Sequence, residues 1–258
     1  MELQKKIDAV QEMRLLEDVF FEAVAQDIPA VQEILRTILE DENLVVETVI
    51  TQRTISNLYG RGVRLDAMCT MGDGSKCNIE IQRADNDDHL RRARLNAASV
   101  TVRESNPGDK FRDVVDVYVV YITEFDIFGY NKTIYHVDKT IRENGVTVDD
   151  GLHEVFVNTK IKDGTKISHL MDLFTKTQFE SKEFPALSKR VNFLKTSEGG
   201  KTEMDTVMGK LLKEERAEVT IKAICNMIKY GVPKEKILAD YSVDDYNAAL
   251  AEMEKVNN

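Results

Sequence analysis

The sequence predicts an α/β protein in which a mixed sheet is flanked by helices and followed by a helical C-terminal region. Apolar residues in 3–40 recur at the spacing that is typical of helices. Residues 63–82 alternate between apolar and polar side chains on both sides of a glycine-containing turn, which predicts a hairpin. A helical pattern at 86–105 then leads to a continuous apolar run at 114–123. A strand reached through a helix pairs in parallel, so the sheet is expected to be mixed.

The composition is that of an ordinary soluble globular protein, with 42% apolar and 31% charged residues in a chain of 258. No apolar run is long enough to cross a bilayer, so we expect no membrane association. Three cysteines do not make a disulfide framework, which favours a reducing cytoplasm. The net charge of -10 argues against a protein that coats nucleic acid non-specifically, and it suits a site that gathers divalent cations.

The N-terminal region is predicted to form two helices followed by a strand. The apolar positions of the helices are Phe20, Val24, Ile28, Val31, Ile34, Leu35, Ile38 and Leu39. Pro29 falls inside this pattern and indicates a break between the two helices. The segment LVVETVI at 44–50 is rich in β-branched residues and predicts the first strand.

The hairpin has a register that can be predicted. Its apolar residues occupy odd positions on both strands, and residues that face each other across two strands share one face of the sheet. The turn therefore needs an odd number of residues. Gly72-Asp73-Gly74 satisfies this need, with Gly74 in the left-handed conformation. The resulting pairs are Met71 with Ser75, Cys69 with Cys77, and Asp66 with Glu80.

The next helix and strand follow from the same kind of pattern. The helix at 86–105 opens with acidic residues, which suit a helix N-terminus, and Asn106-Pro107-Gly108 ends it. The apolar run at 114–123 predicts a strand that is buried on both faces.

The rest of the chain divides into weaker strands and helices. Residues 133–138 and 154–159 predict two further strands, and from about residue 166 the pattern is helical to the end. We therefore predict two domains, a sheet-containing domain over 1–165 and a helical region over 166–258.

One face of the hairpin collects polar side chains. These are Arg64, Asp66, Asn78, Glu80 and Gln82. Two carboxylates that face each other on adjacent strands repel unless a cation neutralises them. Oxygen ligands on rigid strands suit Mg²⁺, which lowers the pKa of bound water and stabilises charge on a phosphorus centre. Gln82 shares this face and can orient the attacking water. An ordinary solvated polar face is the alternative interpretation.

Asp66, followed by Glu80-Ile81-Gln82 across a hairpin and before a helix, resembles the PD-(D/E)XK restriction-endonuclease-like fold, whose core is αβββαβ. More narrowly, nearly the whole chain resembles the recombination-promoting nucleases and related transposases of bacteria. The likeness lies in GRGVRLDAM, NIEIQRAD, RRARLNAA, VYVVYITEFDIFGYNKTIYHVD, EVFVNTKIKD and YGVPKEKILADYSV. It implies a cytoplasmic bacterial DNA endonuclease that hydrolyses phosphodiester bonds with Mg²⁺, for which Mn²⁺ substitutes.

The resemblance also implies roles for individual residues. Asp66 and Glu80 match the metal-binding acids, and the backbone carbonyl of Ile81 is implied as a further metal ligand. Gln82 matches a position often held by lysine, and it completes the catalytic set with the two acids. This glutamine is typical of the subfamily, but it removes a positive charge and implies heavier reliance on the metal. Leu65 stands where the superfamily's name has proline, which is a variable position.

A helix before the sheet often adds an acid in this fold. Asp18 and Glu22 are the two candidates, and Asp18 matches better as a possible further metal ligand.

DNA contact is expected from arginines near the hairpin, because arginine binds phosphate with two parallel hydrogen bonds. The candidates are Arg64, Arg83, Arg91, Arg92 and Arg94. Those in the helical segment can equally form ion pairs with Asp87 and Asp88 along the helix.

Two other functions remain open from the sequence. The chain can be a DNA-associated binding protein on the same fold whose catalysis is weak or lost. It can also be a regulatory interaction protein whose acidic face meets a basic partner. Divalent-ion binding separates these alternatives from a nuclease.

The C-terminal helices have three interpretations. They can simply pack on the nuclease domain, read DNA as a helix–turn–helix, or form a dimer. The last helices carry more acid than base, which argues against DNA reading. A nuclease with one site per chain cuts two strands most simply as a pair, so we expect a homodimer with contacts from these helices.

Overall fold

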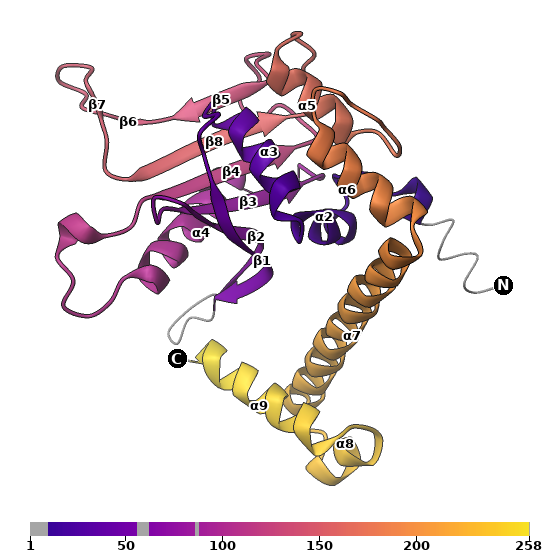
Figure 1. The fold of residues 1–258 in the computed structure, drawn as a ribbon. Helices are drawn as coiled ribbons and strands as arrows, with labels where there is room; N and C mark the ends of the chain where they lie inside the picture. The colour runs from indigo at the N-terminus through magenta and orange to yellow at the C-terminus, as the bar shows by residue number, and fades with distance from the viewer. Residues whose placement is uncertain (1–9, 56–61, 86–87, 258) are drawn as a thin grey trace. The chain divides into compact units, whose positions relative to one another are not determined.

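The computed structural model of the chain describes residues 10–55, 62–85 and 88–257 (Figure 1). Two compact units divide it. One contains the residues up to Ile55 together with Val63–Met204, and the other contains the residues from Asp205 onward. Each unit is described below by itself.

The first unit is built on a six-stranded sheet with the strand order β1-β2-β3-β4-β8-β5. The strands are β1 Val46–Ile55, β2 Val63–Met71, β3 Lys76–Gln82, β4 Val117–Thr123, β5 Ile134–Val137 and β8 Leu152–Asn158. Strands β1, β2 and β3 pair antiparallel, β4 lies parallel to both β3 and β8, and β5 pairs antiparallel with β8. The predicted mixed sheet with flanking helices is confirmed (Figure 1).

The parallel pairing of β3 and β4 depends on the crossover helix α4, His89–Glu104. Asp88 caps this helix, because its carboxylate accepts a hydrogen bond from the backbone N–H of Arg91 at 3.0 Å. Small residues of α4 pack over β2 and β4 in one core cluster that includes Ala93, Ala97 and Val100. Strand β4 therefore has neighbours on both sides and on its faces, which explains its nearly continuous apolar sequence.

The hairpin of β2 and β3 has the predicted register. Cys69 pairs with Cys77, and the N–H of Met71 donates to the carbonyl of Ser75 at 2.9 Å. Gly74 has a φ of 90°, a conformation that favours glycine because it has no Cβ. The polar face of the hairpin is not solvated as an outer face would be. Met68, Asn78 and Glu80 are buried on it.

The two predicted N-terminal helices are α2, Asp18–Ala25, and α3, Ile28–Ile38. The carboxylate of Asp27 accepts a hydrogen bond from the N–H of Ala30 at 3.0 Å and caps α3. Pro29 lies in the first turn of α3, where its missing N–H costs nothing. The predicted break is therefore the start of the second helix.

Several boundaries differ from the prediction. Strand β1 continues to Ile55, five residues beyond the predicted end at 50, through the polar stretch TQRT that the β-branched pattern did not include. A short 3-10 turn, η1 Phe111–Asp113, precedes β4, which starts at Val117 rather than at 114. Two short strands, β6 Lys139–Thr140 and β7 Thr147–Val148, pair with each other and were not predicted. Elements of this length carry too few residues to show a period.

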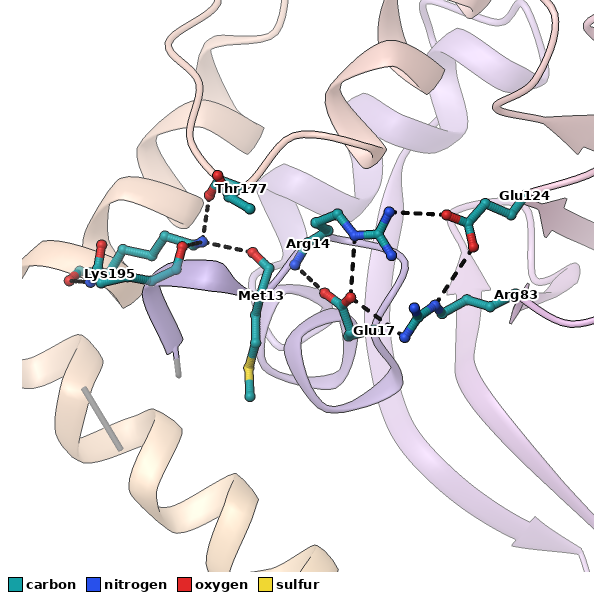
Figure 2. A network of polar contacts seen from close by, with 8 residues as sticks. Met13, Arg14, Glu17, Arg83, Glu124, Thr177 and Lys195 are labelled. Atoms are coloured by element: carbon teal, nitrogen blue, oxygen red, sulfur yellow. Dashed lines mark hydrogen bonds and ion pairs between the residues drawn. The ribbon is translucent and has the colours of Figure 1, made fainter. Parts of the chain in front are cut away.

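Helices α5, Lys166–Phe174, and α6, Pro185–Thr196, contact the N-terminal helices. Lys195 on α6 is buried, and its Nζ donates to the backbone carbonyls of Gln11, Met13 and Thr177 (Figure 2). Burial lowers the pKa of Lys195 to about 8. These three acceptors favour the charged ammonium and hold the segment before α2 against α6.

The domain boundary between 165 and 166 remains a prediction.

The second unit has a small apolar core of its own. Its buried members are Ile224, Ile237, Tyr246 and Ala249. They come from α7, Glu198–Lys229, which begins in the first unit, and from α8, Lys234–Asp240, and α9, Val243–Asn257. Gly231, with a φ of 74°, follows the end of α7 as predicted. Among the helices that the structure describes, none has the length and apolar character needed to cross a membrane.

Candidate active site

The hairpin brings the two predicted metal-binding acids together. Strands β2 and β3 pair down to Ala67 and Ile79, and the next position in this register sets Asp66 opposite Glu80. Beyond Ala67, the side chain of Asp66 rather than its backbone bonds to β3. Its Oδ2 accepts a hydrogen bond from the N–H of Ile81 at 2.9 Å. Asp66 is therefore held rigidly toward β3, as a metal ligand should be.

Glu80 is deeply buried, with 1% of its surface exposed. Its Oε1 accepts a hydrogen bond from Nδ2 of Asn78 at 3.1 Å. Its Oε2 has no hydrogen-bond partner among the described residues. Burial, and then the nearby charge of Asp66, raise the pKa of Glu80 to about 8. A buried carboxylate oxygen without a hydrogen-bond partner, on a group with a raised pKa, fits a site that binds a cation.

Asp66 is perturbed in the same direction. Burial raises its pKa to about 6, and the hydrogen bond from Ile81 opposes this effect. The negative charge of Asp18, in the first turn of α2, adds to the rise. Asp18 thus lies close enough to Asp66 to interact with it, and burial raises the pKa of Asp18 as well. Glu22, the other candidate, is buried one turn later on the same helix.

Gln82 lies at the end of β3 with both ends of its amide engaged. Its Oε1 accepts a hydrogen bond from Nη1 of Arg92 at 3.1 Å, and its Nε2 donates to the carbonyl of Ala84 at 3.1 Å. The amide retains one N–H and one lone pair for a water or a phosphate. The role of Gln82 in orienting water stays a prediction.

Arg92 belongs to the site more closely than the sequence indicated. Its Nη2 lies 3.8 Å from Oε2 of Glu80. The sequence grouped it with other arginines as a DNA contact and did not place it beside the acids. Helical spacing could have indicated this position, because Arg92 is one turn after buried His89 and one turn before buried Asn96, and so lies on the same side of the helix.

Gln52 was not among the residues that the sequence predicted for the site. It lies on β1 opposite Asp66, between the pairs of Thr51 with Ala67 and of Arg53 with Leu65. Its φ of 50° is rare for a residue with a side chain, and such conformations gather at functional sites. Its side chain hydrogen-bonds Asp66, which lowers the pKa of that carboxyl against burial. No local pattern predicts a left-handed glutamine in a strand.

Arg83, predicted to contact DNA, lies in a network of ion pairs (Figure 2). Its Nη1 lies 3.5 Å from Oε1 of Glu17, and its Nε lies 3.6 Å from Oε2 of Glu124. Arg14 contacts the same two acids, with 2.9 Å between Nη1 and Oε1 of Glu124. The network joins the segment before α2 to the ends of β3 and β4. Contact with a phosphate would require Arg83 to leave two carboxylates.

The other predicted DNA contacts lie on the surface. Nε of Arg64 donates to Oε1 of Gln52 at 2.5 Å, next to the acids. Arg91 is 77% exposed and pairs with Asp88 at 3.2 Å, and Arg94 is exposed on the same helix. The pairing of Arg91 with Asp88 is the kind of along-helix ion pair that the sequence left open.

The residues present fit a divalent cation in part. Two close carboxylates, raised pKa values and the unsatisfied Oε2 of Glu80 are consistent with one. Within the described ranges, no group of three or more His, Cys, Asp or Glu side chains is arranged to hold a metal. Asp66 and Glu80 are therefore the core of the candidate centre. The Ile81 carbonyl and Asp18 stay predicted further ligands.

A mixed sheet with an acidic pair on its second and third strands, followed by a crossover helix, is the arrangement of the PD-(D/E)XK nucleases. A family model described as PD-(D/E)XK nuclease family transposase matches residues 19–247. The chain belongs to this family. The match confirms the resemblance found in the sequence motifs, and it extends into the second unit. No curated protein and no solved structure matches the chain.

Proposed function

We propose that this protein is a Mg²⁺-dependent DNA endonuclease that hydrolyses phosphodiester bonds. The observation that carries the proposal is the pair of the half-buried Asp66 and the buried Glu80, whose pKa values are raised to about 6 and about 8. Such a pair is unfavourable when both groups are ionised without a cation, and perturbed carboxyls of this kind cluster at functional sites. Family membership implies phosphodiester hydrolysis and a DNA substrate.

The carboxylates of Asp66 and Glu80 would hold the ion, with Mn²⁺ able to substitute for Mg²⁺. A bound Mg²⁺ lowers the pKa of a water ligand and stabilises charge on the phosphate. Asn78 and the N–H of Ile81 keep the two carboxylates in place through their hydrogen bonds. Gln82 offers its remaining N–H and lone pair to the water or to the phosphate.

DNA would approach over the exposed side of α4 and the neighbouring arginines. Arg91 and Arg94 are exposed there, on a helix that carries four arginines in a chain with a net charge of -10. Arg64 lies at the edge of the site beside Gln52. A local basic surface of this kind binds the phosphate backbone without reading sequence. The description of the family supports a cellular role in transposition or DNA recombination.

The second candidate is a DNA-associated protein on the same fold with weak or lost catalysis. The neutral Gln82 at a position often held by lysine favours it. Both candidates bind DNA, but only the nuclease requires its two acids for strand cleavage.

Cleavage of supercoiled plasmid tests the proposal. We expect nicking or linearisation with Mg²⁺ or Mn²⁺ and none with EDTA. Asp66→Asn and Glu80→Gln keep the side-chain shape and should lower the rate by about 100-fold or more, because each removes charge from the metal centre. Glu47→Gln, at an exposed glutamate on β1, is the matched control and should cleave normally.

Equal cleavage by Glu80→Gln and the parent protein would contradict the assignment. DNA binding without cleavage under either ion would favour the second candidate.

A further inference from the structure

Arg92 lies beside Glu80, and its charge acts on Asp18 and Asp66 as well. Its Nη1 donates to Oε1 of Gln82 at 3.1 Å, and its Nη2 lies 3.8 Å from Oε2 of Glu80. Its charge opposes the effect of burial on the pKa of Asp18, Asp66 and Glu80. The Arg92 side chain is 41% exposed, so a large anion can reach it from solvent.

The start of α4 is anchored in a way that directs Arg92 to the site. Nδ1 of His89 lies 3.1 Å from the hydroxyl of Tyr121 on β4, and Nε2 of His89 lies 3.2 Å from Oδ1 of Asp85. His89 and Tyr121 are buried. Residues three apart lie on neighbouring positions of one helix side, so fixing His89 also fixes the direction of Arg92.

Position 82 leaves the centre short of positive charge. Glutamine is neutral, whereas charge develops on the phosphate during hydrolysis. A fixed cation aimed at that charge is worth most in a site shielded from water. Arginine keeps its charge at every physiological pH and has five N–H donors. Only one of those of Arg92 is used by Gln82.

We propose that Arg92 is the cationic residue of this site and binds the phosphate group that is cleaved. The inference rests on the proposed nuclease function. Gln82 then acts as a positioning residue, because its carbonyl oxygen orients the guanidinium. Arg92 on α4 then supplies the positive charge that a lysine at position 82 would supply from β3.

Single-turnover plasmid cleavage by the full-length protein with Mg²⁺ tests this role. We expect Arg92→Ala to lower the rate by about 100-fold, the loss that follows removal of one transition-state donor. Arg92→Lys should retain more activity, since it keeps a charge. Arg103→Ala is the matched control, because Arg103 is an exposed arginine in the last turn of the same helix. It should cleave at the parent rate.

A rescue experiment distinguishes a role of Arg92 as a positive charge from a role in supporting the fold. Gln82→Lys in the Arg92→Ala background supplies a cation from the neighbouring strand. It should raise the rate by about tenfold or more over Arg92→Ala alone. A residue that only supported the fold would not be replaced in this way. Equal melting temperatures of Arg92→Ala and the parent show that the fold is intact.

Binding without metal gives a readout independent of cleavage. The affinity for a short DNA duplex is measured in EDTA at several salt concentrations. Each phosphate contact contributes about 0.9 to the slope of log K against log salt. Arg92→Ala should lower this slope by about one contact, and Gln82→Lys should restore it. Arg103→Ala should leave the slope unchanged.

The two proposals fail in distinguishable ways. If the parent protein cleaves no DNA with any divalent ion, the nuclease function is wrong, and the salt slope still decides whether Arg92 binds phosphate. If the parent cleaves and Arg92→Ala cleaves equally well, the inference about Arg92 is overturned while the nuclease stands. A loss that Gln82→Lys does not rescue, with an unchanged slope, also overturns it.

Discussion

At Glu80, burial and the Asp66 carboxylate act in the same direction on one ionisable group. Both disfavour the charged form, and the pKa of Glu80 rises to about 8 while that of Asp66 rises to about 6. An acid whose pKa is higher in the folded than in the unfolded protein stabilises the fold at low pH and loses that contribution as the pH rises. The metal-free protein therefore loses stability progressively as the pH rises from about 4 to about 8, and the full penalty from this pair remains above pH 8.

We predict that Glu80→Gln raises the melting temperature at pH 8.5 in EDTA by about 5 °C, because no charge has to be buried. At pH 4 the variant and the parent should melt alike. Added Mg²⁺ should stabilise the parent at pH 8.5 and should not stabilise Glu80→Gln. Thermal unfolding followed by circular dichroism measures each case.

Glu47→Gln provides the control for this experiment and should melt like the parent at both pH values. A Glu80→Gln variant that is less stable than the parent at pH 8.5 would show that Glu80 is not a strained carboxylate.

At the scale of elements, two of the three glycines of α7, Gly200 and Gly209, lie in different surroundings. A Cβ at Gly200 would lie 2.0 Å from the carbonyl oxygen of Phe193 and 2.6 Å from Cα of Leu194, both on α6. A Cβ at Gly209 would meet no atom within 4 Å. Gly200 therefore permits the close approach of α6 to the start of α7. Gly209 only weakens the helix, because glycine has a low helix propensity.

The same substitution should have opposite effects at these two positions. Gly200→Ala should destabilise the protein by about 2 kcal/mol or more, since backbone atoms must move. Gly209→Ala should stabilise α7 by up to about 1 kcal/mol. Urea unfolding of both variants beside the parent measures the difference. Equal effects would mean that α6 and α7 do not approach closely at Gly200.

At the scale of the whole molecule, we predict a homodimer at micromolar concentration. One site per chain must cut two strands, and two-fold pairs are the commonest oligomers. Leu212 and Val219 are 49% and 62% exposed on α7. They are separated by two helical turns and so lie on one side of the helix. Light scattering on the full chain measures the mass.

A charge on that side of α7 should separate the chains. Leu212→Glu is expected to give a monomer, whereas Ala217→Glu, at an exposed position on the opposite side of the same helix, should leave the dimer intact. A monomeric parent protein rules out this pairing.

Local rules of the sequence by themselves determined much of the fold. The hairpin register follows from the alternation of the strands and the odd number of turn residues, and Gly74 adopts the conformation this requires. Asp27 and Asp88 each cap the helix that directly follows them, which is a short-range effect. The parallel pairing of β3 and β4 follows from the crossover helix. These features follow from local signals and from the connections between consecutive elements.

The tertiary structure alone decided how the site residues are surrounded. Periodicity shows which side of α4 is apolar, but it does not show which strand lies beneath it, so Arg92 could not be placed beside Glu80. The left-handed Gln52 and the pairing of Arg83 with Glu17 and Glu124 likewise join distant segments. The pKa of a carboxyl depends on every layer that excludes water from it. The sequence therefore identified the two acids, and only the exclusion of water around them in the folded protein makes them a strained pair that favours a cation.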